Sequence, residues 1–287
     1  MLDKACPVCK SVMTAGNEPW HFVCKRCHYE MATLLPTINK TDLHRPLDEL
    51  SRESGLRTVR NINFKTLLNR ICTFTSNHHK LLDVGCAHGW FLELAKNHFD
   101  VLGIEPDQTI FKQTLKLGLP IRMGYFPQIL STDEKFDVIV FNDVIEHIPD
   151  IQSVLSACND HLKDDGLLVL NLPDSNGVFY RLSKIFNFIG MKGFFERMWQ
   201  VGMPSPHIHY FNQKNLGILL ASQGFEVKDK GRLETLSLDG LYTRLTYANK
   251  KTRPIVTSLI YCLIFIAMPL LKILPSDIAY VITQKKK

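Results

Sequence analysis

The sequence lacks the features of a disordered or a secreted protein. It contains no long low-complexity tract, and 45% of its residues are apolar while only 22% are charged, which excludes wholesale disorder. The first ten residues have no apolar core of the kind found in signal peptides. We therefore expect a cytoplasmic protein and not a secreted scaffold held by disulfides. With 287 residues, the chain can form one large domain, or one and a half smaller ones.

The body of the chain also lacks a net charge. The formal total is +6, and residues 250–287 alone carry seven basic residues and one acid, so residues 1–249 sum to zero. Phosphate-dominated binding needs a basic face, which a neutral body does not offer as a whole. The positive charge of residues 250–287 indicates instead that the tail binds an anionic surface, such as a membrane. The basic residues of the tail are Lys250, Lys251, Arg253, Lys272, Lys285, Lys286 and Lys287.

The apolar runs of the sequence are short for a helix that crosses a bilayer. The longest uncharged one, residues 255–271, would form a helix of about 25 Å at ~1.5 Å per residue, against about 30 Å of hydrocarbon. Pro269 disturbs its last turn. We therefore expect an apolar helix over 254–273 that lies in the interface of an anionic membrane and makes the protein peripheral to it. Packing on its own domain or in an oligomer contact, and a spanning helix, are the alternatives.

Four of the eight cysteines lie within the first 27 residues, and the other four are scattered singly. The first four have the spacing Cys-x2-Cys-x14-Cys-x2-Cys, in which each pair forms a turn that points both sulfurs at one ion. We predict a zinc ribbon over residues 1–35, whose folding energy comes mostly from metal ligation, on the order of 10–16 kcal/mol. Free thiols or two disulfides are the alternative. The predicted zinc ligands are Cys6, Cys9, Cys24 and Cys27.

Strand and helix patterns alternate from residue 80 to residue 172. Apolar strands that alternate with helices of about 10–15 residues predict a parallel sheet covered on both faces. Before this region, the prolines and the glycine of 36–59 indicate a linker, and residues 60–75 have helical spacing. The predicted strands are 81–84, 101–105, 136–142 and 166–173, and the predicted helices are 91–99, 107–118 and 151–162.

A turn that contains two glycines follows the first of these strands. Ligands of parallel sheets bind at the carboxyl ends of the strands. Gly85 permits a tight turn after Asp83, and Gly89 lets the next helix start close to the sheet. Glu105 ends the second strand, 22 residues after Asp83, where a carboxylate can accept two hydrogen bonds from a ribose diol. The turn and the acid together favour a nucleoside ligand; an ordinary strand–helix turn with a surface glutamate is the alternative.

Four segments of this region match one family in order and spacing. LLDVGCAHGWFLELA, GIEPD, FDVIVFNDVIEHIPD and LKDDGLLVLNLP resemble the successive motifs of class I S-adenosylmethionine-dependent methyltransferases. The resemblance implies a Rossmann-like α/β domain over 60–287 with a seven-stranded sheet, parallel except for one strand. The sixth and seventh strands would be 224–229 and 276–284. The implied cofactor-binding residues are Asp83, Gly85, Cys86, Ala87, Gly89, Glu105, Pro106, Tyr125, Phe126, Asn142 and Asp143.

The sequence departs from the family pattern at two places in the cofactor site. Ala87 stands where the family usually has the middle glycine of the turn, which implies an altered loop geometry with binding retained. The stretch 124–130 lacks the acid that many members offer to the adenine amino group. Tyr125 and Phe126 provide an aromatic face there instead.

The segment DVIEH resembles the matching stretch of ubiquinone-pathway O-methyltransferases, in which an acid, a glutamate and a histidine are associated with a divalent metal. The resemblance implies a second metal site at Asp143, Glu146 and His147, and these residue types suit such an ion. In the alternative, Glu146 caps the following helix and His147 packs near the cofactor.

About forty residues rich in aromatic side chains, 173–212, separate the strand 166–173 from a helix predicted near 213–223. Insertions at this place commonly form the substrate lid in the family, and an apolar lid excludes water from the transfer. The end of the lid is similar to the H-x-x-x-F segment of small-molecule and lipid-directed members. A histidine with a pKa near neutrality can take the proton of an acceptor hydroxyl, and a histidine bonded to the backbone is the alternative. The candidate catalytic residues are His207, His209 and His147.

From these features we predict methyl transfer from S-adenosylmethionine to an oxygen of a small-molecule or lipid-linked acceptor. One alternative is an RNA base methyltransferase. Bacterial ribosomal-RNA guanine methyltransferases also join an N-terminal zinc module to this fold, and CHYEMATLLP resembles their sequence. A zinc-ribbon adaptor without catalysis is a further alternative, against which the intact set of Asp83, Gly85, Gly89 and Glu105 argues.

Overall fold

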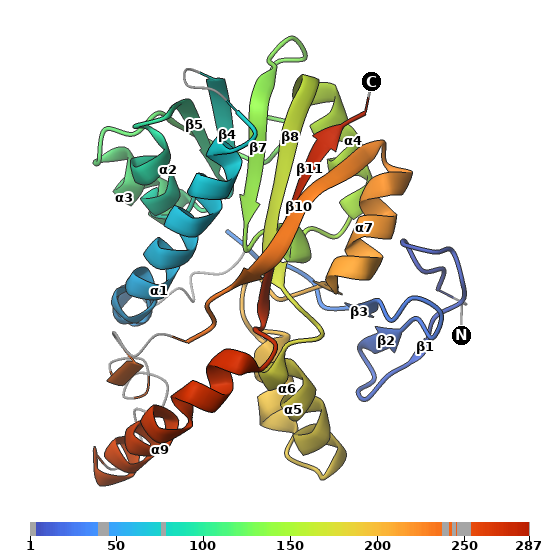
Figure 1. Cartoon of the computed structure of the whole chain (residues 1–287), viewed down its shortest axis with the longest axis vertical. Coiled ribbons are helices and arrows are strands. Elements are labelled where there is room, and N and C mark those ends of the chain that lie inside the picture. The colour runs from blue at the N-terminus through green and yellow to red at the C-terminus, as the bar shows by residue number, and fades with distance from the viewer. Residues whose placement is uncertain are drawn as a thin grey trace.

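The computed structural model describes residues 4–39, 46–75, 79–236, 241–242, 245 and 254–286. The basic cluster of Lys250, Lys251 and Arg253 lies outside these residues, as does the stretch 40–45 of the predicted linker. A large sheet runs through the molecule with helices on both faces, and a small sheet lies beside it (Figure 1). Helices project from the body at the lower end of this view.

The large sheet has seven strands in the order β10-β11-β8-β7-β4-β5-β6. Neighbouring strands are parallel, except that β11 pairs antiparallel with both β8 and β10. This topology confirms the predicted seven-stranded sheet with one antiparallel strand. The strands are β4 (His79–Val84), β5 (Phe99–Glu105), β6 (Ile121–Met123), β7 (Phe136–Asn142), β8 (Leu162–Pro173), β10 (Phe225–Leu233) and β11 (Ile278–Lys285).

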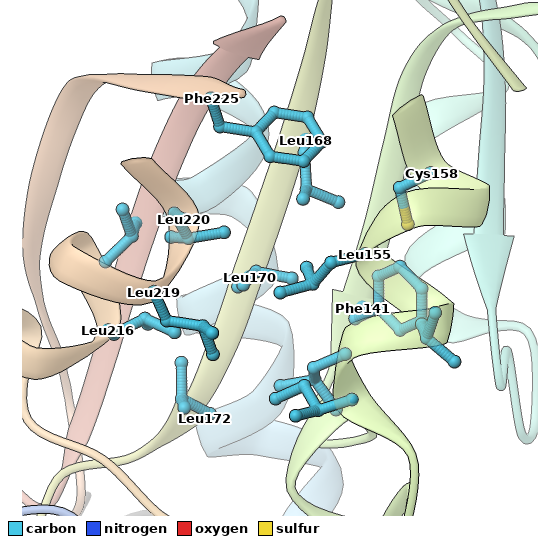
Figure 2. Packing of buried hydrophobic residues seen from close by; sticks show 14 of the residues in the cluster. Phe141, Leu155, Cys158, Leu168, Leu170, Leu172, Leu216, Leu219, Leu220 and Phe225 are labelled. Carbon is cyan, nitrogen blue, oxygen red and sulfur yellow. The ribbon is translucent and has the colours of Figure 1, made fainter. Parts of the chain in front are cut away.

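The two faces of the sheet bury different residues, because successive side chains of a strand point to opposite sides. Leu81 packs in a cluster with helices α1 and α2, whereas its neighbour Leu82 packs in a cluster with helices α4 and α7. Figure 2 shows the second cluster, where Leu155 of α4 and Leu219 of α7 face Leu170 of β8. The helices are α1 (Pro46–Cys72), α2 (Trp90–Ala95), α3 (Gln108–Leu115), α4 (Ile151–His161) and α7 (Gln213–Ser222).

Helix α1 begins at Pro46 and not near residue 60, so much of the range predicted as a linker, 36–59, is helical. A proline is favoured in the first turn of a helix, since the N–H that it lacks has no partner there. Pro46, which lies in the predicted linker, is instead the first residue of a helix.

The N-terminal ribbon, residues 4–35, forms the small sheet together with a segment far along the chain. Its strands are β1 (Thr14–Ala15), β2 (His21–Val23) and β3 (Glu30–Ala32), and β3 pairs antiparallel with β9 (His209–Tyr210). The ribbon also packs beside α7, where Asn215 donates a hydrogen bond to the carbonyl of Cys27 at 3.2 Å. Ribbon side chains belong to the same buried cluster as α4, α7 and the sheet, so this packing is continuous with the large domain.

Two helical segments project at the same end of the molecule (Figure 1). One contains α5 (Val178–Phe188) and α6 (Lys192–Met198) within the predicted lid, and the other is α9 (Pro254–Ile273), as predicted between β10 and β11. Both carry exposed apolar side chains, such as Phe188 at 90% and Ile266 at 74% exposure. Within the described part of the chain, no helix combines the length and the apolarity that crossing a membrane requires.

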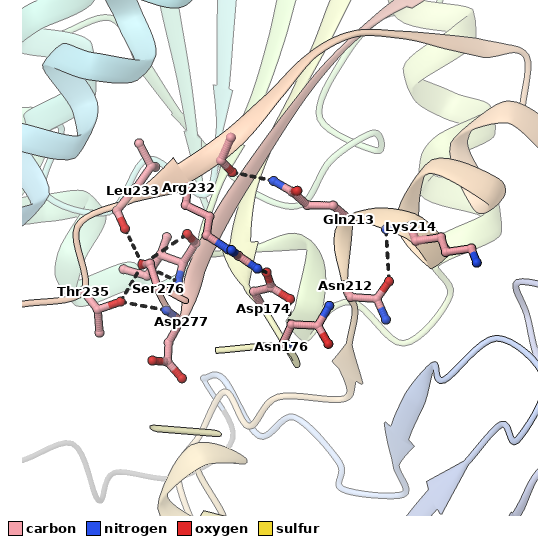
Figure 3. A network of polar contacts seen from close by, with 12 residues as sticks. Asp174, Asn176, Asn212, Gln213, Lys214, Arg232, Leu233, Thr235, Ser276 and Asp277 are labelled. Carbon is pink, nitrogen blue, oxygen red and sulfur yellow. Dashed lines mark hydrogen bonds and ion pairs between the residues drawn. The ribbon is translucent and has the colours of Figure 1, made fainter. Parts of the chain in front are cut away.

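A network of polar contacts links the two segments where they join the body of the protein (Figure 3). Asp277, at the start of β11, caps α5: its carboxylate accepts the N–H groups of Tyr180 at 2.7 Å and Phe179 at 3.1 Å. The backbone N–H of Asp277 donates to the hydroxyl of Thr235, a residue just after β10, at 2.8 Å. The end of α9 and the beginning of the lid are therefore fixed to one another and to the sheet.

Candidate functional site

Three polar side chains lie together at the carboxyl edge of the sheet. Asp83, Glu105 and Asn142 stand at or next to the ends of β4, β5 and β7, which are adjacent strands. Their position follows from the parallel order, since the carboxyl ends of parallel strands meet at one edge. Sequence reasoning predicted all three residues for the cofactor.

Glu105 links the ends of β4 and β5. One carboxylate oxygen accepts the N–H of Ala87 at 2.9 Å, and the other accepts the N–H of Asp107 at 2.7 Å. The side chain is buried. The backbone of the turn after β4 is thereby held against the acid that was predicted to contact a ribose.

The turn itself has a left-handed backbone at three alternate positions. Gly85 and Gly89 both have φ of 71°, and Ala87 has φ of 44°. A Cβ atom on Gly85 would lie 2.6 Å from Val144, and one on Gly89 would lie 2.5 Å from Leu119, so both positions exclude side chains. Ala87 has a methyl group but adopts the left-handed conformation that glycine favours. The turn therefore has room for this small side chain, and the backbone at Ala87 is strained.

Asp83 is buried and belongs to a chain of amide contacts. Asn142 donates to Asp83 at 3.3 Å, and Asn171 of β8 donates to Asn142 at 3.4 Å. Burial raises the pKa of Asp83 to about 8, the Asn142 hydrogen bond lowers it, and the nearby Glu105 carboxylate raises it further. The side-chain oxygen of Asn171 is buried without a hydrogen-bond partner among the described residues. Sequence reasoning missed Asn171, although its place near the end of a buried strand was a usable signal.

The remaining predicted cofactor residues divide between the rim of the site and the core. Phe126 is buried edge-on against Phe141 at 5.8 Å between ring centres, so it belongs to the core and offers no open aromatic face. Tyr125 is half exposed and remains available to a ligand. Pro106 follows Glu105, and its carbonyl accepts a hydrogen bond from Asn39 at 2.7 Å. Cys86 is buried in the turn, and its N–H donates to the carbonyl of Ile104 at 3.0 Å.

A second group of residues lies just beyond β7. The Glu146–His147–His207 cluster has one ligand atom from each residue within 4.8 Å of the others. The ring nitrogens Nε2 of His147 and His207 lie 3.8 Å and 3.9 Å from Oε1 of Glu146. Glu146 and His147 come from the short 3₁₀ helix η1 (Ile145–His147), and His207 comes from the end of the lid.

Glu146 is fully buried, and neither carboxylate oxygen has a hydrogen-bond partner among the described residues. Burial raises its pKa well above the usual range, and the nearby charge of Asp143 adds to this effect. A buried acid in such a place is either protonated or balanced by a cation. Nδ1 of His147 lies 2.9 Å from the carbonyl of Pro206, and since a carbonyl only accepts, Nδ1 carries the proton. In the neutral ring, this leaves Nε2 with its lone pair toward Glu146, as in a metal-binding histidine.

The structure changes the composition of the predicted second metal site. Asp143 has a left-handed backbone with φ of 55°, and its carboxylate faces Arg60 of α1 at 3.4 Å. His207 takes its place beside Glu146 and His147. A pattern within one segment suggested Asp143, whereas His207 reaches the cluster from 60 residues away in the sequence and only the fold brings it there. No signal in the sequence indicated Arg60.

His209 does not lie in this cluster. Its Nε2 donates to the carbonyl of Ile148 at 2.8 Å, and its Nδ1 forms a short hydrogen bond with the hydroxyl of Tyr29 in the ribbon. Burial lowers its pKa to about 4, so the ring is neutral. With both nitrogens bonded to the protein, His209 is a structural residue, and the prediction that it takes a proton from the acceptor is wrong. His207, by contrast, lies in the cluster, with Nε2 2.9 Å from the side-chain nitrogen of Gln200.

The four N-terminal cysteines converge on one point. Their sulfurs all lie within 4.8 Å of one another, and the closest pairs, Cys6 with Cys27 and Cys9 with Cys24, are 3.5 Å and 3.4 Å apart. A disulfide would need about 2.05 Å. The cysteines are free, which removes the predicted alternative of two disulfides.

The two cysteine turns also have the same backbone. In each, the N–H of the first cysteine donates to the carbonyl five residues later, Ser11 in one turn and Tyr29 in the other, at 2.8 Å. The fourth residue after that cysteine, Lys10 or His28, has a left-handed backbone with φ of 61° or 58°. The repeated turn presents both pairs of sulfurs to a common centre.

The comparisons with known proteins agree with this geometry. A family model described as a methyltransferase domain matches residues 51–230, which is more than half of the chain. The chain therefore belongs to this methyltransferase domain family.

Curated relatives are similar over part of their length. The chain is 25% identical over 182 residues to the mitochondrial ubiquinone biosynthesis O-methyltransferase of Bos taurus, covering 54% of this chain and 49% of that protein. It is 36% identical over 106 residues to the ubiquinone biosynthesis O-methyltransferase of Pasteurella multocida, covering 31% of this chain and 44% of that protein. The chain thus spans about half the length of the curated relatives it matches.

Solved structures share the fold. A SAM-dependent methyltransferase from Archaeoglobus fulgidus superposes with a TM-score of 0.54 at 20% identity, covering 85% of this chain and 100% of that one. Magnesium protoporphyrin IX methyltransferase from Synechocystis PCC 6803, solved with bound SAH, gives a TM-score of 0.54 at 11% identity, covering 82% of this chain and 87% of that one. These likenesses concern the fold alone.

Proposed function

We propose that the chain transfers a methyl group from S-adenosylmethionine to an oxygen of a small-molecule or lipid-linked acceptor. The observation that carries this proposal is the edge of the sheet where the strained turn after β4, Asp83 and Glu105 meet, next to the Glu146–His147–His207 cluster. The cofactor supplies an activated methyl group, so the protein has to align the acceptor with it and remove the acceptor's proton.

Residues of the turn and the strand ends would hold the cofactor. Glu105 would accept the ribose hydroxyls, and Asp83 and Asn142, beside it at the carboxyl edge of the sheet, would contact the neighbouring part of the ligand. Gly85 and Gly89 would let the turn take the shape that holds the cofactor, since a side chain at either position would meet Val144 or Leu119. Tyr125 is the remaining candidate for contact with the adenine, because Phe126 is in the core.

The Glu146–His147–His207 cluster would serve the acceptor. Its two imidazoles and one buried carboxylate are the ligand types of a divalent cation, which would supply a Lewis acid for the acceptor oxygen. Without a cation, His207 or His147 would take the proton of the acceptor hydroxyl directly. Manganese binding measured by electron paramagnetic resonance distinguishes the two cases, because Glu146→Gln abolishes the bound signal only if the cluster holds a cation.

The four cysteines would hold one structural zinc ion. A tetrahedral site with zinc–sulfur distances of about 2.3 Å separates the sulfurs by roughly 3.8 Å, close to the spacing seen here. All four positions of the metal are then filled by protein, so the ion has no open position for a substrate and stabilises the ribbon instead.

Helix α9 would place the enzyme on an anionic membrane, where a lipid-linked acceptor is found. Leu259, Leu263 and Ile266 are at least 60% exposed. A contiguous apolar surface of this kind usually marks an interaction site. The basic residues of the tail would add attraction to acidic headgroups, at about 1 kcal/mol per charge near the surface.

The central experiment measures cofactor binding and methyl transfer separately. We expect isothermal calorimetry to show S-adenosylmethionine binding to the wild-type chain and its loss in Glu105→Ala, while the same change at the exposed Glu226 leaves binding intact. With tritiated cofactor, label should enter the lipid extract. The proposal is wrong if the wild-type chain does not bind the cofactor, and the acceptor class is wrong if label enters only ribosomal RNA.

A further inference from the structure

Glu30, in strand β3 of the N-terminal ribbon, is a buried carboxylate with partners in both the ribbon and the lid. It is only 5% exposed. Oε2 accepts hydrogen bonds from Nε2 of His21 at 2.7 Å and from the hydroxyl of Tyr180 at 2.8 Å. Oε1 accepts from Nζ of Lys184 at 2.8 Å. Tyr180 and Lys184 are one turn apart on α5, so a single ribbon side chain holds one face of the first lid helix.

The proton on His21 is fixed by its other contacts. Nδ1 of His21 accepts the backbone N–H of Asn17 at 3.0 Å, so Nε2 is the nitrogen that donates to Glu30. Both ring nitrogens are therefore satisfied within the ribbon. The ribbon thus holds the carboxylate of Glu30 in place as a hydrogen-bond acceptor. The lid supplies the hydroxyl of Tyr180 and the ammonium group of Lys184, which donate to it.

Aromatic packing joins the ribbon to the second lid helix. Trp20 stacks on Phe195 with ring centres 5.8 Å apart, and His21 lies edge-on to Phe195 at 5.1 Å. Trp199, at the end of α6, is fully buried within 5.7 Å of Trp20 and 5.2 Å of His21. The outer side of the lid carries exposed apolar residues such as Phe188, so its buried contacts lie on the side of the ribbon and β9.

The same contacts continue into the Glu146–His147–His207 cluster. The backbone N–H of His207 donates to the carbonyl of Trp199 at 3.1 Å. The next residue, Ile208, is bonded on both sides at 2.8 Å: its carbonyl accepts the N–H of Ala32 in the ribbon, and its N–H donates to the carbonyl of Glu146. One residue therefore separates the ribbon backbone from the backbone of the cluster.

We propose that the N-terminal ribbon positions the lid and the acceptor side of the site, with Glu30 as the positioning residue. The ribbon is then a support for the Glu146–His147–His207 cluster and not a module that binds nucleic acid. This inference rests on the proposed function only where it calls the cluster the acceptor side. It requires that the state of the ribbon controls the order of residues 178–211 while the cofactor turn after β4 is unaffected.

The variant Glu30→Gln tests this directly. The amide matches the carboxylate in shape, but its NH₂ group faces donors from His21, Tyr180 or Lys184, so the buried network loses its acceptor. In hydrogen–deuterium exchange of the full chain, we expect amides of 178–199 to exchange about tenfold faster, since ~1.4 kcal/mol corresponds to a factor of ten. Peptides from β4, β5 and β7 should exchange at the wild-type rate, and the Kd of S-adenosylmethionine should change by less than about twofold.

A spectroscopic signature separates positioning from general loosening. In nitrogen-15 spectra of the histidine rings, the signals of His207 and His147 should shift in Glu30→Gln, whereas the signal of His79, at the start of β4, should stay in place. Glu226→Gln makes the same chemical change on β10, where Glu226 pairs with Lys228 at 2.9 Å, and it serves as the matched control.

Lys184→Met is the second variant, in case Glu30→Gln does not fold. The Lys184 side chain is 33% exposed on a projecting helix, so its replacement removes one partner of Glu30 and leaves the core intact. We expect a smaller increase in lid exchange, about threefold. Wild-type exchange over 178–199 in both variants overturns the inference, and so does a uniform increase over the whole chain. Failure of the proposed function would appear elsewhere, as absence of cofactor binding in the wild-type chain.

Discussion

Two glycines, Gly85 and Gly118, have the same left-handed backbone but differ in the space around them, so their substitutions separate the effect of a steric clash from that of backbone strain. Gly85 and Gly118 have φ of 71° and 70°, but a Cβ would meet Val144 at 2.6 Å on the former and nothing within 4 Å on the latter. We expect Gly118→Ala to lower the free energy of unfolding by about 1 kcal/mol. Gly85→Ala should lower it by about 2–4 kcal/mol, because the clash adds to the strain.

Chemical denaturation of the two variants measures this difference, and Gly85→Ala combined with Val144→Ala should recover part of the loss. Equal effects of Gly85→Ala and Gly118→Ala would show that the turn has space for a side chain, contrary to the structure.

Asp83 makes the stability of the ligand-free protein depend on pH. Its pKa is about 8 in the folded chain, raised mainly by burial from an ordinary value of 3.8. Between pH 4 and pH 8 the unfolded chain has lost this proton while the folded chain keeps it, so the contribution of Asp83 to stability falls as the pH rises. By pH 7 the loss is on the order of 4 kcal/mol.

We therefore expect Asp83→Asn, which still accepts the hydrogen bond of Asn142, to unfold at a higher denaturant concentration at pH 7 and to show a flatter profile between pH 4 and pH 8. Asp133→Asn, at an exposed position, is the control. A wild-type slope in Asp83→Asn would mean that Asp83 titrates normally.

Among the single residues of the candidate site, local backbone geometry was predictable from the sequence, and side-chain partners were only partly so. Gly85, Gly89 and Glu105 follow from the spacing of a strand, a turn and a helix, which neighbouring residues determine. The sequence does not tell whether an aromatic residue in a loop, such as Phe126, faces a ligand or the core. The role of His209 was not predictable because its partner, Tyr29, is 180 residues away.

At the scale of elements, the sequence predicted what is periodic and missed what is short. Buried strands such as β7 and the capped helix α3 carry their own signal, and the side chain of Asp107 caps α3 by accepting the N–H groups of Thr109 and Ile110. Strands β6 and β9 have three and two residues, too few for any period to appear. The position of β9 is determined by its pairing with β3, which no local pattern encodes.

The N-terminal ribbon is the element whose stability should depend on metal. Its strands have only two or three residues each, and its cysteine sulfurs converge within 4.8 Å. We expect elemental analysis to find one zinc ion per chain in the wild type and none in Cys24→Ser. Zinc removal should also lower the melting temperature, because ligation supplies folding energy.

The matched control is Cys262→Ser, which changes an exposed cysteine on α9 and should leave both the zinc content and the melting temperature unchanged. Zinc retained in Cys24→Ser would rule out the four-thiolate site.

At the scale of the whole molecule, the arrangement of the two projecting helical segments predicts how the protein meets a surface. α9 and the lid extend at the same end, and both expose apolar side chains (Figure 1). We expect the chain to co-sediment with vesicles that contain acidic lipids, and less so as salt is raised, since screening weakens the attraction of the basic tail. The double variant Leu263→Glu, Ile266→Glu should weaken vesicle binding at least about tenfold, because each exposed apolar side chain contributes about 1.5–3 kcal/mol when buried.

Leu117→Glu is the control for this measurement, since Leu117 is 53% exposed just after the end of α3 and lies on neither segment. An equal loss of vesicle binding in Leu117→Glu, or binding that does not depend on acidic lipid, would contradict membrane docking through α9.

The position of β11 has a consequence for the order in which the protein is made. β11 follows both β8 and β10 in the sequence, yet it lies between them and pairs with both. During translation the edges of β8 and β10 that pair with β11 therefore stay unpaired until residues 278–285 leave the ribosome. Unpaired strand edges can form hydrogen bonds with other chains. Strand β3 of the ribbon also stays without its partner β9, which is synthesised about 180 residues later. The large sheet is therefore closed only when a strand synthesised after both of its neighbours inserts between them.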